Sequence, residues 1–86
     1  MTGIPVTFPL SDLQRGASAR VDHIKVEGPQ RRRLMDLGFV SGTEVEAVML
    51  APLGDPMAYR VRGATIALRA DQAALVIVTA IENEKI

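Results

Sequence analysis

The chain contains no cysteine and no tryptophan, and its aromatic residues are one tyrosine and two phenylalanines. The absence of cysteine excludes disulfides and thiolate metal ligands. With so few aromatic side chains, a core must be built from aliphatic residues, and these are available because 48% of the chain is hydrophobic. The 86 residues are enough for one small domain, with few left over for a second core.

A net charge is also absent, because ten basic residues balance ten acidic ones. This balance argues against bulk electrostatic attraction to nucleic acid or acidic lipid. No apolar run approaches the ~20 residues that a membrane-spanning helix needs. Met1 to Phe8 also lack the cationic start and apolar core of a secretion signal. We therefore expect a cytoplasmic protein without direct membrane insertion.

One short stretch has the start, the apolar stripe and the stop of a helix. Pro29 suits the first helical position, and Leu34 and Leu37 lie three residues apart on one face. Gly38 stands where a left-handed C′ residue belongs, which predicts a Schellman stop with the N–H of Phe39 bonded to the carbonyl of Leu34. So short a helix is marginal alone, so its leucines must pack against the rest of the domain.

Most of the remaining chain alternates apolar and polar residues in short runs, a pattern typical of half-buried strands. In one of these runs Val45, Ala47 and Met49 are expected to face the core. So small a chain cannot form a two-sheet sandwich, and we therefore expect a mainly β fold, a small, partly open barrel with one or two short helices. The strands number about five and lie at residues 17–24, 43–50, 57–61, 64–69 and 75–81, with a one-turn crossover at 71–74.

Turn signals mark the connections between these runs. Ser11 and Gln14 have the spacing of a capping box, and Gly16 is expected to end that single turn. Arg62 and Gly63 suit a tight hairpin turn between two strands. The expected organisation is a lead-in at residues 1–8, a barrel domain at residues 9–81 and a charged tail at residues 82–86.

The helix and the turn after it also carry a recognisable motif. Residues 33–42 read Arg-Leu-Met-Asp-Leu-Gly-Phe-Val-Ser-Gly and resemble the Arg-Leu-x-x-Leu-Gly-hydrophobic-x-Pro-Gly stretch of the FeoA family, small cytosolic proteins of bacterial ferrous iron transport. Ser41 departs from the motif, because the family commonly has proline there, and is expected to loosen the turn. With the central loop, the structural motif positions are Arg33, Leu34, Leu37, Gly38, Gly42, Pro52, Gly54 and Pro56.

The resemblance continues beyond the helix, with a loop at residues 51–56, a strand at 66–69 and a closing segment at 73–78 in the family's order. It implies an SH3-like barrel that is a non-enzymatic partner, without a cofactor, of FeoB, a membrane permease with a cytosolic GTP-binding domain. The same barrel occurs as the terminal domain of iron-dependent repressors, which leaves a free-standing SH3-like regulatory or interaction domain as the alternative. No helix-turn-helix segment precedes the barrel, so we do not expect a DNA-reading repressor.

Residues suited to catalysis or metal binding are few and scattered. His23 is expected to be an ordinary strand-end side chain, and Asp55 a turn residue that bonds its own backbone. No phosphate-binding glycine loop is present, so we expect neither an enzyme nor a nucleotide site. Ferrous iron prefers grouped imidazole and carboxylate ligands, whereas Asp12, Asp22, His23 and Glu27 lie on different elements. We therefore expect no metal site.

The arginines at residues 31–33 are left facing water by the expected helix. The simple interpretation is a solvated helix face. The functional one is a docking surface, because guanidinium groups suit carboxylates on a partner and an exposed methionine adds an adaptable apolar contact. We expect this face, together with a nearby loop at 51–56, to meet the cytosolic part of the permease. The residues of this hypothesis are Arg31, Arg32, Met35, Leu53 and Asp55.

A barrel that binds nucleic acid or proline-rich peptides is the competing class. Such barrels need exposed aromatic side chains, and this chain has Phe8, Phe39 and Tyr59. Phe39 is committed to the helix stop and Tyr59 shares the inward phase of its strand, so we expect no nucleic-acid partner. The outward apolar residues Val48 and Leu50 leave homo-oligomerisation open.

Overall fold

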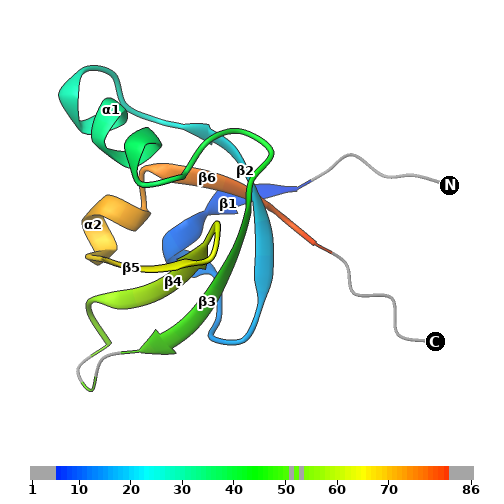
Figure 1. The fold of residues 1–86 in the computed structure, drawn as a ribbon. Coiled ribbons are helices and arrows are strands. Elements are labelled where there is room, and N and C mark those ends of the chain that lie inside the picture. The colour runs from blue at the N-terminus through cyan, green and yellow to red at the C-terminus, as the bar shows by residue number, and fades with distance from the viewer. Residues whose placement is uncertain (1–5, 51, 53, 82–86) are drawn as a thin grey trace, which may run out of the picture.

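The computed structural model of the protein describes residues 6–50, 52 and 54–81. These residues form one six-stranded antiparallel sheet with strand order β1-β6-β2-β3-β4-β5, strongly curled on itself as Figure 1 shows. The elements in chain order are β1 (Thr7–Pro9), the 3₁₀ helix η1 (Leu10–Asp12), β2 (Ser18–Ile24), α1 (Pro29–Asp36), β3 (Glu44–Leu50), β4 (Met57–Val61), β5 (Ala64–Leu68), α2 (Ala70–Ala73) and β6 (Val76–Ala80). The mainly β class with short helices is confirmed, and the sixth strand is β1, which begins inside the expected lead-in.

The core is aliphatic apart from Phe39 and the Tyr59 ring, as the composition requires. It lies inside the curl of the sheet, where the inward residues of β2, β3, β4 and β6 meet α1 and η1. The buried residues are Leu10, Leu13, Ala19, Val21, Ile24, Leu34, Phe39, Val45, Ala47, Tyr59, Val61, Leu68, Ala73, Val76, Ile77 and Val78.

Two register shifts interrupt strands that the alternation of apolar and polar residues predicts as regular. The β2–β6 register shifts between Val21 and His23, and the β3–β4 register shifts between Ala47 and Met49. One extra residue in a strand turns the following side chains to the other face. Val45 and Ala47 are buried as expected, but the prediction that Met49 faces the core was wrong, because beyond the shift its side chain is 62% exposed.

The connections follow their turn chemistry in one case and not in another. Arg62 (φ 53°) and Gly63 (φ 81°) both have positive φ between β4 and β5, which is the two-residue hairpin that was predicted. The capping box at Ser11 was wrong. The helical turn starts at Leu10 with Pro9 as its cap residue, because the burial of Leu10 places Ser11 inside the turn.

No helix in the described part of the chain combines the length and the apolar character needed to cross a lipid bilayer. The predicted charged tail, residues 82–86, and the first five residues of the lead-in lie outside the described residues.

Candidate partner-binding site

Helix α1 stands at one end of the barrel (Figure 1), where a few of its side chains pack against the core. Pro29 occupies the first turn as predicted, after Gly28 with φ 86°. Leu34 is 1% exposed and Leu37 is half-buried against the core. Burial of a leucine side chain stabilises a fold by about 1.5–3 kcal/mol, so these two contacts anchor the helix.

The end of α1 has the geometry that the sequence predicts. The N–H of Phe39 donates to the carbonyl of Leu34 at 3.1 Å, and the N–H of Gly38 donates to that of Met35 at 3.0 Å. Gly38 has φ 113°, and the side chains of Phe39 and Leu34 are both buried in the core. The Schellman stop therefore fixes the helix end by residues within one segment of the sequence.

The opposite face of α1 is open to solvent. Arg32 and Arg33 are exposed, Arg31 is half-buried, and Met35 is 39% exposed. The surface along this side of the helix is a shallow hollow with charged and apolar walls. Its lining residues are Gly28, Pro29, Arg31, Arg32, Met35 and Asp36.

The arginines of α1 have no carboxylate partner within the described ranges. The ion pairs found there join His23 with Asp22 at 2.7 Å, Arg60 with Glu46 at 3.5 Å, and Arg69 with Asp71 at 3.8 Å. All three pairs belong to other elements. The guanidinium groups of α1 are therefore free to meet acidic groups of another molecule.

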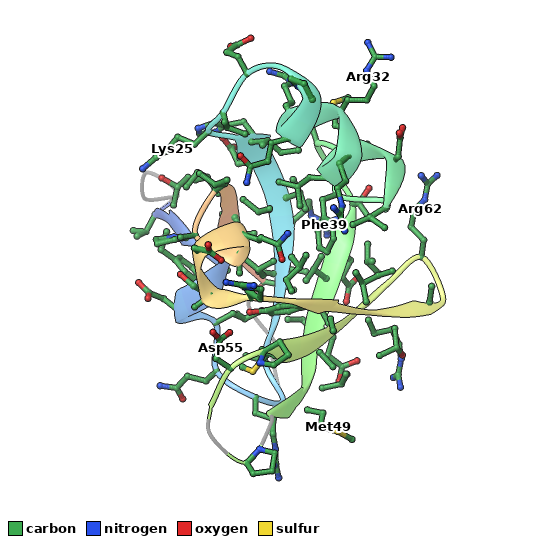
Figure 2. The ribbon with its side chains drawn as sticks, turned by 90° about the vertical axis from the view of Figure 1, so that its left-hand side faces the viewer. Lys25, Arg32, Phe39, Met49, Asp55 and Arg62 are labelled. Atoms are coloured by element: carbon green, nitrogen blue, oxygen red, sulfur yellow. The ribbon has the colours of Figure 1, made fainter. Side chains whose placement is uncertain are left out.

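Arg62 adds a further guanidinium beside α1, although its place in the sequence predicts only a role in the hairpin turn. A Cβ atom built on Gly38 would lie 3.2 Å from Cδ of Arg62 and 3.4 Å from Cγ2 of Val61. The stem of Arg62 thus lies over Gly38, and Figure 2 shows its head on the same side of the molecule as Arg32. No local sequence signal indicates this contact, because it depends on how the β4–β5 hairpin meets the helix.

The loop at residues 51–56 does not join this face. Figure 1 places the described residues of the loop, 52 and 54–56, and α1 at opposite ends of the barrel, and Figure 2 places Asp55 and Arg32 likewise. Pro52, Gly54 and Asp55 are exposed there, while Leu53 lies outside the described residues. The single continuous docking surface expected from the sequence therefore separates into two, and α1 carries the arginines and Met35.

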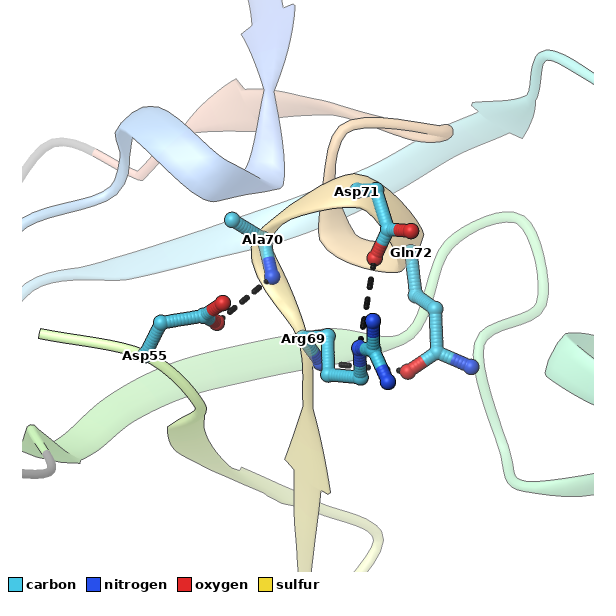
Figure 3. A network of polar contacts seen from close by, with 5 residues as sticks. All are labelled: Asp55, Arg69, Ala70, Asp71 and Gln72. Atoms are coloured by element: carbon cyan, nitrogen blue, oxygen red, sulfur yellow. Dashed lines mark hydrogen bonds and ion pairs between the residues drawn. The ribbon is translucent and has the colours of Figure 1, made fainter.

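Asp55 has a structural role that the sequence did not reveal. Its Oδ1 accepts a 2.7 Å hydrogen bond from the backbone N–H of Ala70, 15 residues away, at the start of α2 (Figure 3). The expectation that Asp55 bonds its own backbone was therefore wrong. Burial raises the pKa of Tyr59 above its ordinary value of 10.0, and the negative charge of Asp55 raises it further.

Of the residues considered for metal binding, Asp22 and His23 lie on one strand, not on different elements as expected, and contact each other. His23 lies within β2, and its Nδ1 is 2.7 Å from Oδ2 of its neighbour Asp22, with both side chains about half exposed (55% and 49%). Within residues 6–50, 52 and 54–81, no group of three or more His, Cys, Asp or Glu side chains converges on a point.

Comparison with known proteins identifies the fold and the family. Residues 8–80 match the model of the FeoA domain. The chain belongs to the FeoA family. A relative is the Fe(2+) transport protein A/Fe(2+) transporter FeoB fusion protein of Porphyromonas gingivalis, 35% identical over 74 residues. That match covers 86% of this chain and 9% of the fusion protein, so the chain corresponds to a small part of that relative.

Solved FeoA structures share the barrel. The FeoA-like protein of Clostridium acetobutylicum is 33% identical, with a TM-score of 0.83 over 99% of this chain and 95% of that one. The FeoA of Stenotrophomonas maltophilia, solved with zinc and described as a prokaryotic SH3 domain protein, is 36% identical, with a TM-score of 0.74 over 83% of this chain and 88% of that one. The fold is thus the expected SH3-like barrel, and the family is one of ferrous iron transport.

The barrel also occurs in repressors, as the resemblance implied. A manganese-dependent transcriptional repressor superposes with a TM-score of 0.79 at 15% identity, over 94% of this chain and 45% of the repressor. At this identity the likeness concerns the fold alone, because one fold hosts many functions.

Proposed function

We propose that this FeoA-family chain is a non-enzymatic accessory protein of ferrous iron uptake that binds the cytosolic part of the permease FeoB and modulates it. The observation that carries the proposal is the open face of α1, where Arg31, Arg32 and Arg33 have no ion-pair partner in the described part of the chain and Met35 is exposed. The fusion of an FeoA and an FeoB in one relative supports the choice of partner.

The chemistry of the α1 face favours a protein partner with acidic groups. A guanidinium group binds a carboxylate through two parallel hydrogen bonds, and arginine is enriched among the residues that dominate binding energy at interfaces. Met35 lies among the arginines in the same hollow and can adapt its flexible side chain to an apolar contact. The face thus combines charge recognition with a small apolar centre.

The fusion relative also bears on how strong the contact has to be. A tether between two modules turns their association into an intramolecular step with an effective concentration near the millimolar range for short flexible linkers. In that relative, a modest interface of a few arginines would then be sufficient. Such a partner modulates the permease by binding two of its states with different affinity.

The proposal is tested by measuring the affinity of the 86-residue chain for full-length FeoB of the same organism in nanodiscs. We expect the double variant Arg31→Glu/Arg32→Glu to bind at least tenfold more weakly. The control Arg15→Glu changes an exposed arginine in the loop before β2 and should bind as the wild type does. Unchanged affinity of a folded Arg31→Glu/Arg32→Glu variant would contradict the proposal.

A further inference from the structure

The sheet has two edges, and they differ in length and in chemistry. One edge is β1, which has three residues and ends in Pro9. The other is β5, which has five residues, Ala64–Leu68, and no charged residue or proline. Natural sheets protect exposed edges with short strands, prolines or charges because unpaired backbone groups recruit other strands. The β1 edge has two of these protections and β5 has none.

The register shows which backbone groups of β5 are free. A two-residue hairpin joins the strands, so Val61 and Ala64 form a hydrogen-bonded pair, and such pairs recur at every second residue. The backbone groups of Ile66 and Leu68 then also face β4. The backbone groups of Thr65 and Ala67 point away from β4, towards the open edge of the sheet. No backbone partner for them occurs among the described residues.

Helix α2 limits this free row at one end. Arg69 is the next residue with the outward orientation, and its N–H donates to Oε1 of Gln72 at 3.1 Å (Figure 3). Its carbonyl accepts the N–H groups of Gln72 and Ala73. The free edge therefore consists of two N–H and two C=O groups, on Thr65 and Ala67, and both residues are exposed.

An arginine flanks the free edge on each side. Arg62, at the hairpin, is exposed and has no ion pair in the described part of the chain, whereas Arg69, at the other end, is 72% exposed and lies 3.8 Å from Oδ1 of Asp71. An exposed pair of this kind is weak, so Arg69 can exchange Asp71 for a carboxylate of a partner. A second copy of this chain paired antiparallel through β5 would bring Arg62 of one copy towards Arg69 of the other. Like charges facing each other across paired strands are destabilising, so this edge fits a segment with acidic side chains instead.

We propose that the outer edge of β5 accepts an extended, acidic segment of the partner permease as a seventh strand, through the backbone groups of Thr65 and Ala67. Addition of a strand to a sheet edge is a general mode of peptide recognition, in which backbone hydrogen bonds supply affinity and flanking side chains supply selectivity. The inference rests on the proposed binding of FeoB. Arg62 connects the two surfaces, because its stem lies over Gly38 at the end of α1.

The test uses a pair of variants at one position, with FeoB in nanodiscs as the probe. Thr65→Pro removes an outward N–H that the sheet does not use, and proline is tolerated at strand edges. Thr65→Val keeps this N–H and the β-branched shape. We expect Thr65→Pro to bind FeoB at least tenfold more weakly and Thr65→Val to bind within twofold of the wild type.

Amide hydrogen exchange of the wild-type chain provides a second measurement that needs no variant. In the free chain, the amides of Thr65 and Ala67 should exchange fast and those of Ile66 and Leu68 slowly. In the FeoB complex, read out by NMR after quenching and dissociation, the exchange of the first two should slow at least tenfold.

The outcomes separate this inference from the proposed function. One result overturns strand addition and leaves the proposed function standing. In it, Arg31→Glu/Arg32→Glu loses FeoB binding, Thr65→Pro retains it, and amide exchange at Thr65 and Ala67 does not change in the complex. Absence of FeoB binding by the wild type overturns both. Protection of these amides in the free chain, together with a dimer in sedimentation, would identify a second copy as the occupant and overturn the acidic partner segment.

Discussion

Helices α1 and α2 of this small barrel are stabilised in opposite ways. Helix α1 has eight residues and ends through bonds within its own segment, with the N–H of Phe39 on the carbonyl of Leu34. Helix α2 has four residues, and its first N–H is bound by Asp55 from a loop 15 residues away. The locally encoded helix has an exposed charged face, whereas the other links the β3–β4 loop to the end of β5 through the bond between Asp55 and Ala70.

The largest effect is expected at the anchor of α1. Leu34→Ala removes a buried side chain and should lower the free energy of unfolding by about 2–5 kcal/mol. Met35→Ala on the exposed side of the same helix should change it by less than about 0.5 kcal/mol. Denaturant unfolding of both variants measures the difference, and equal losses would show that α1 does not dock through Leu34.

The next effect concerns the helix stop. Gly38→Ala places a side chain on a backbone with φ 113° and against Arg62, which should cost about 1–3 kcal/mol. Gly16→Ala is the matched control, because Gly16 has φ 90° with nothing within 4 Å of an added Cβ. Gly38→Ala should lower the free energy of unfolding more than Gly16→Ala does. The difference between the two losses should become smaller when both variants also carry Arg62→Ala. An unchanged difference would show that the side chain of Arg62 does not lie against Gly38.

The remote cap of α2 should contribute less. Asp55→Ala removes an acceptor of the kind that N-caps supply, so unfolding free energy should fall by about 0.5–2 kcal/mol. Asp71→Ala in the same helix removes an exposed ion pair with Arg69, the residue before the helix, and should cost about 0–1 kcal/mol. If urea unfolding finds Asp71→Ala to be the more damaging change, the bond from Asp55 to Ala70 is not what holds α2.

These expectations show what could be predicted from the sequence. The stop of α1 was predictable to the atom, because Leu34, Gly38 and Phe39 lie within six residues of each other and interact through the backbone. The cap on α2 was not, because nothing near Asp55 in the sequence indicates which N–H it meets. The exposure of Met49 was missed for a related reason: the shift in β3 arises from pairing with β4.

In the candidate site, too, the features set by local sequence could be predicted and those set by the arrangement of the strands could not. The arginines and Met35 were predictable because they occupy the outer side of a locally encoded helix. The expectation that the 51–56 loop lies near α1 was wrong, because β3 carries the chain to the other end of the barrel before the described loop residues 52 and 54–56 (Figure 1). Arg62 and the free β5 edge were missed because both follow from the sheet order.

The smallest expected effect on stability comes from the titration of Tyr59 at alkaline pH. The pKa of Tyr59 lies above 10.0, because of burial first and the charge of Asp55 second, so the folded state holds the phenolic proton more tightly than the unfolded state. The contribution of the Tyr59 proton to the free energy of unfolding is therefore fully present below pH 10, and it is lost as the pH rises from there through the raised pKa. The chain has one tyrosine and no tryptophan, so ultraviolet absorbance follows Tyr59 alone.

Asp55→Asn removes the negative charge beside Tyr59 and should move its pKa towards 10 without reaching it, because burial is the larger cause. Tyr59→Phe should abolish this part of the alkaline loss of stability. A wild-type tyrosine that titrates at its ordinary pKa while the chain is folded would show that its ring is not held in the core.

Whether FeoB binds the outer face of α1 can be measured by site-specific photo-crosslinking with full-length FeoB in nanodiscs. Benzoylphenylalanine is placed in separate variants at Met35, which is 39% exposed on α1, and at Met49, which is 62% exposed on β3. These two exposed methionines provide matched positions on separate elements. We predict a crosslink to FeoB from position 35 and none from position 49. A crosslink from position 49 alone would contradict the account.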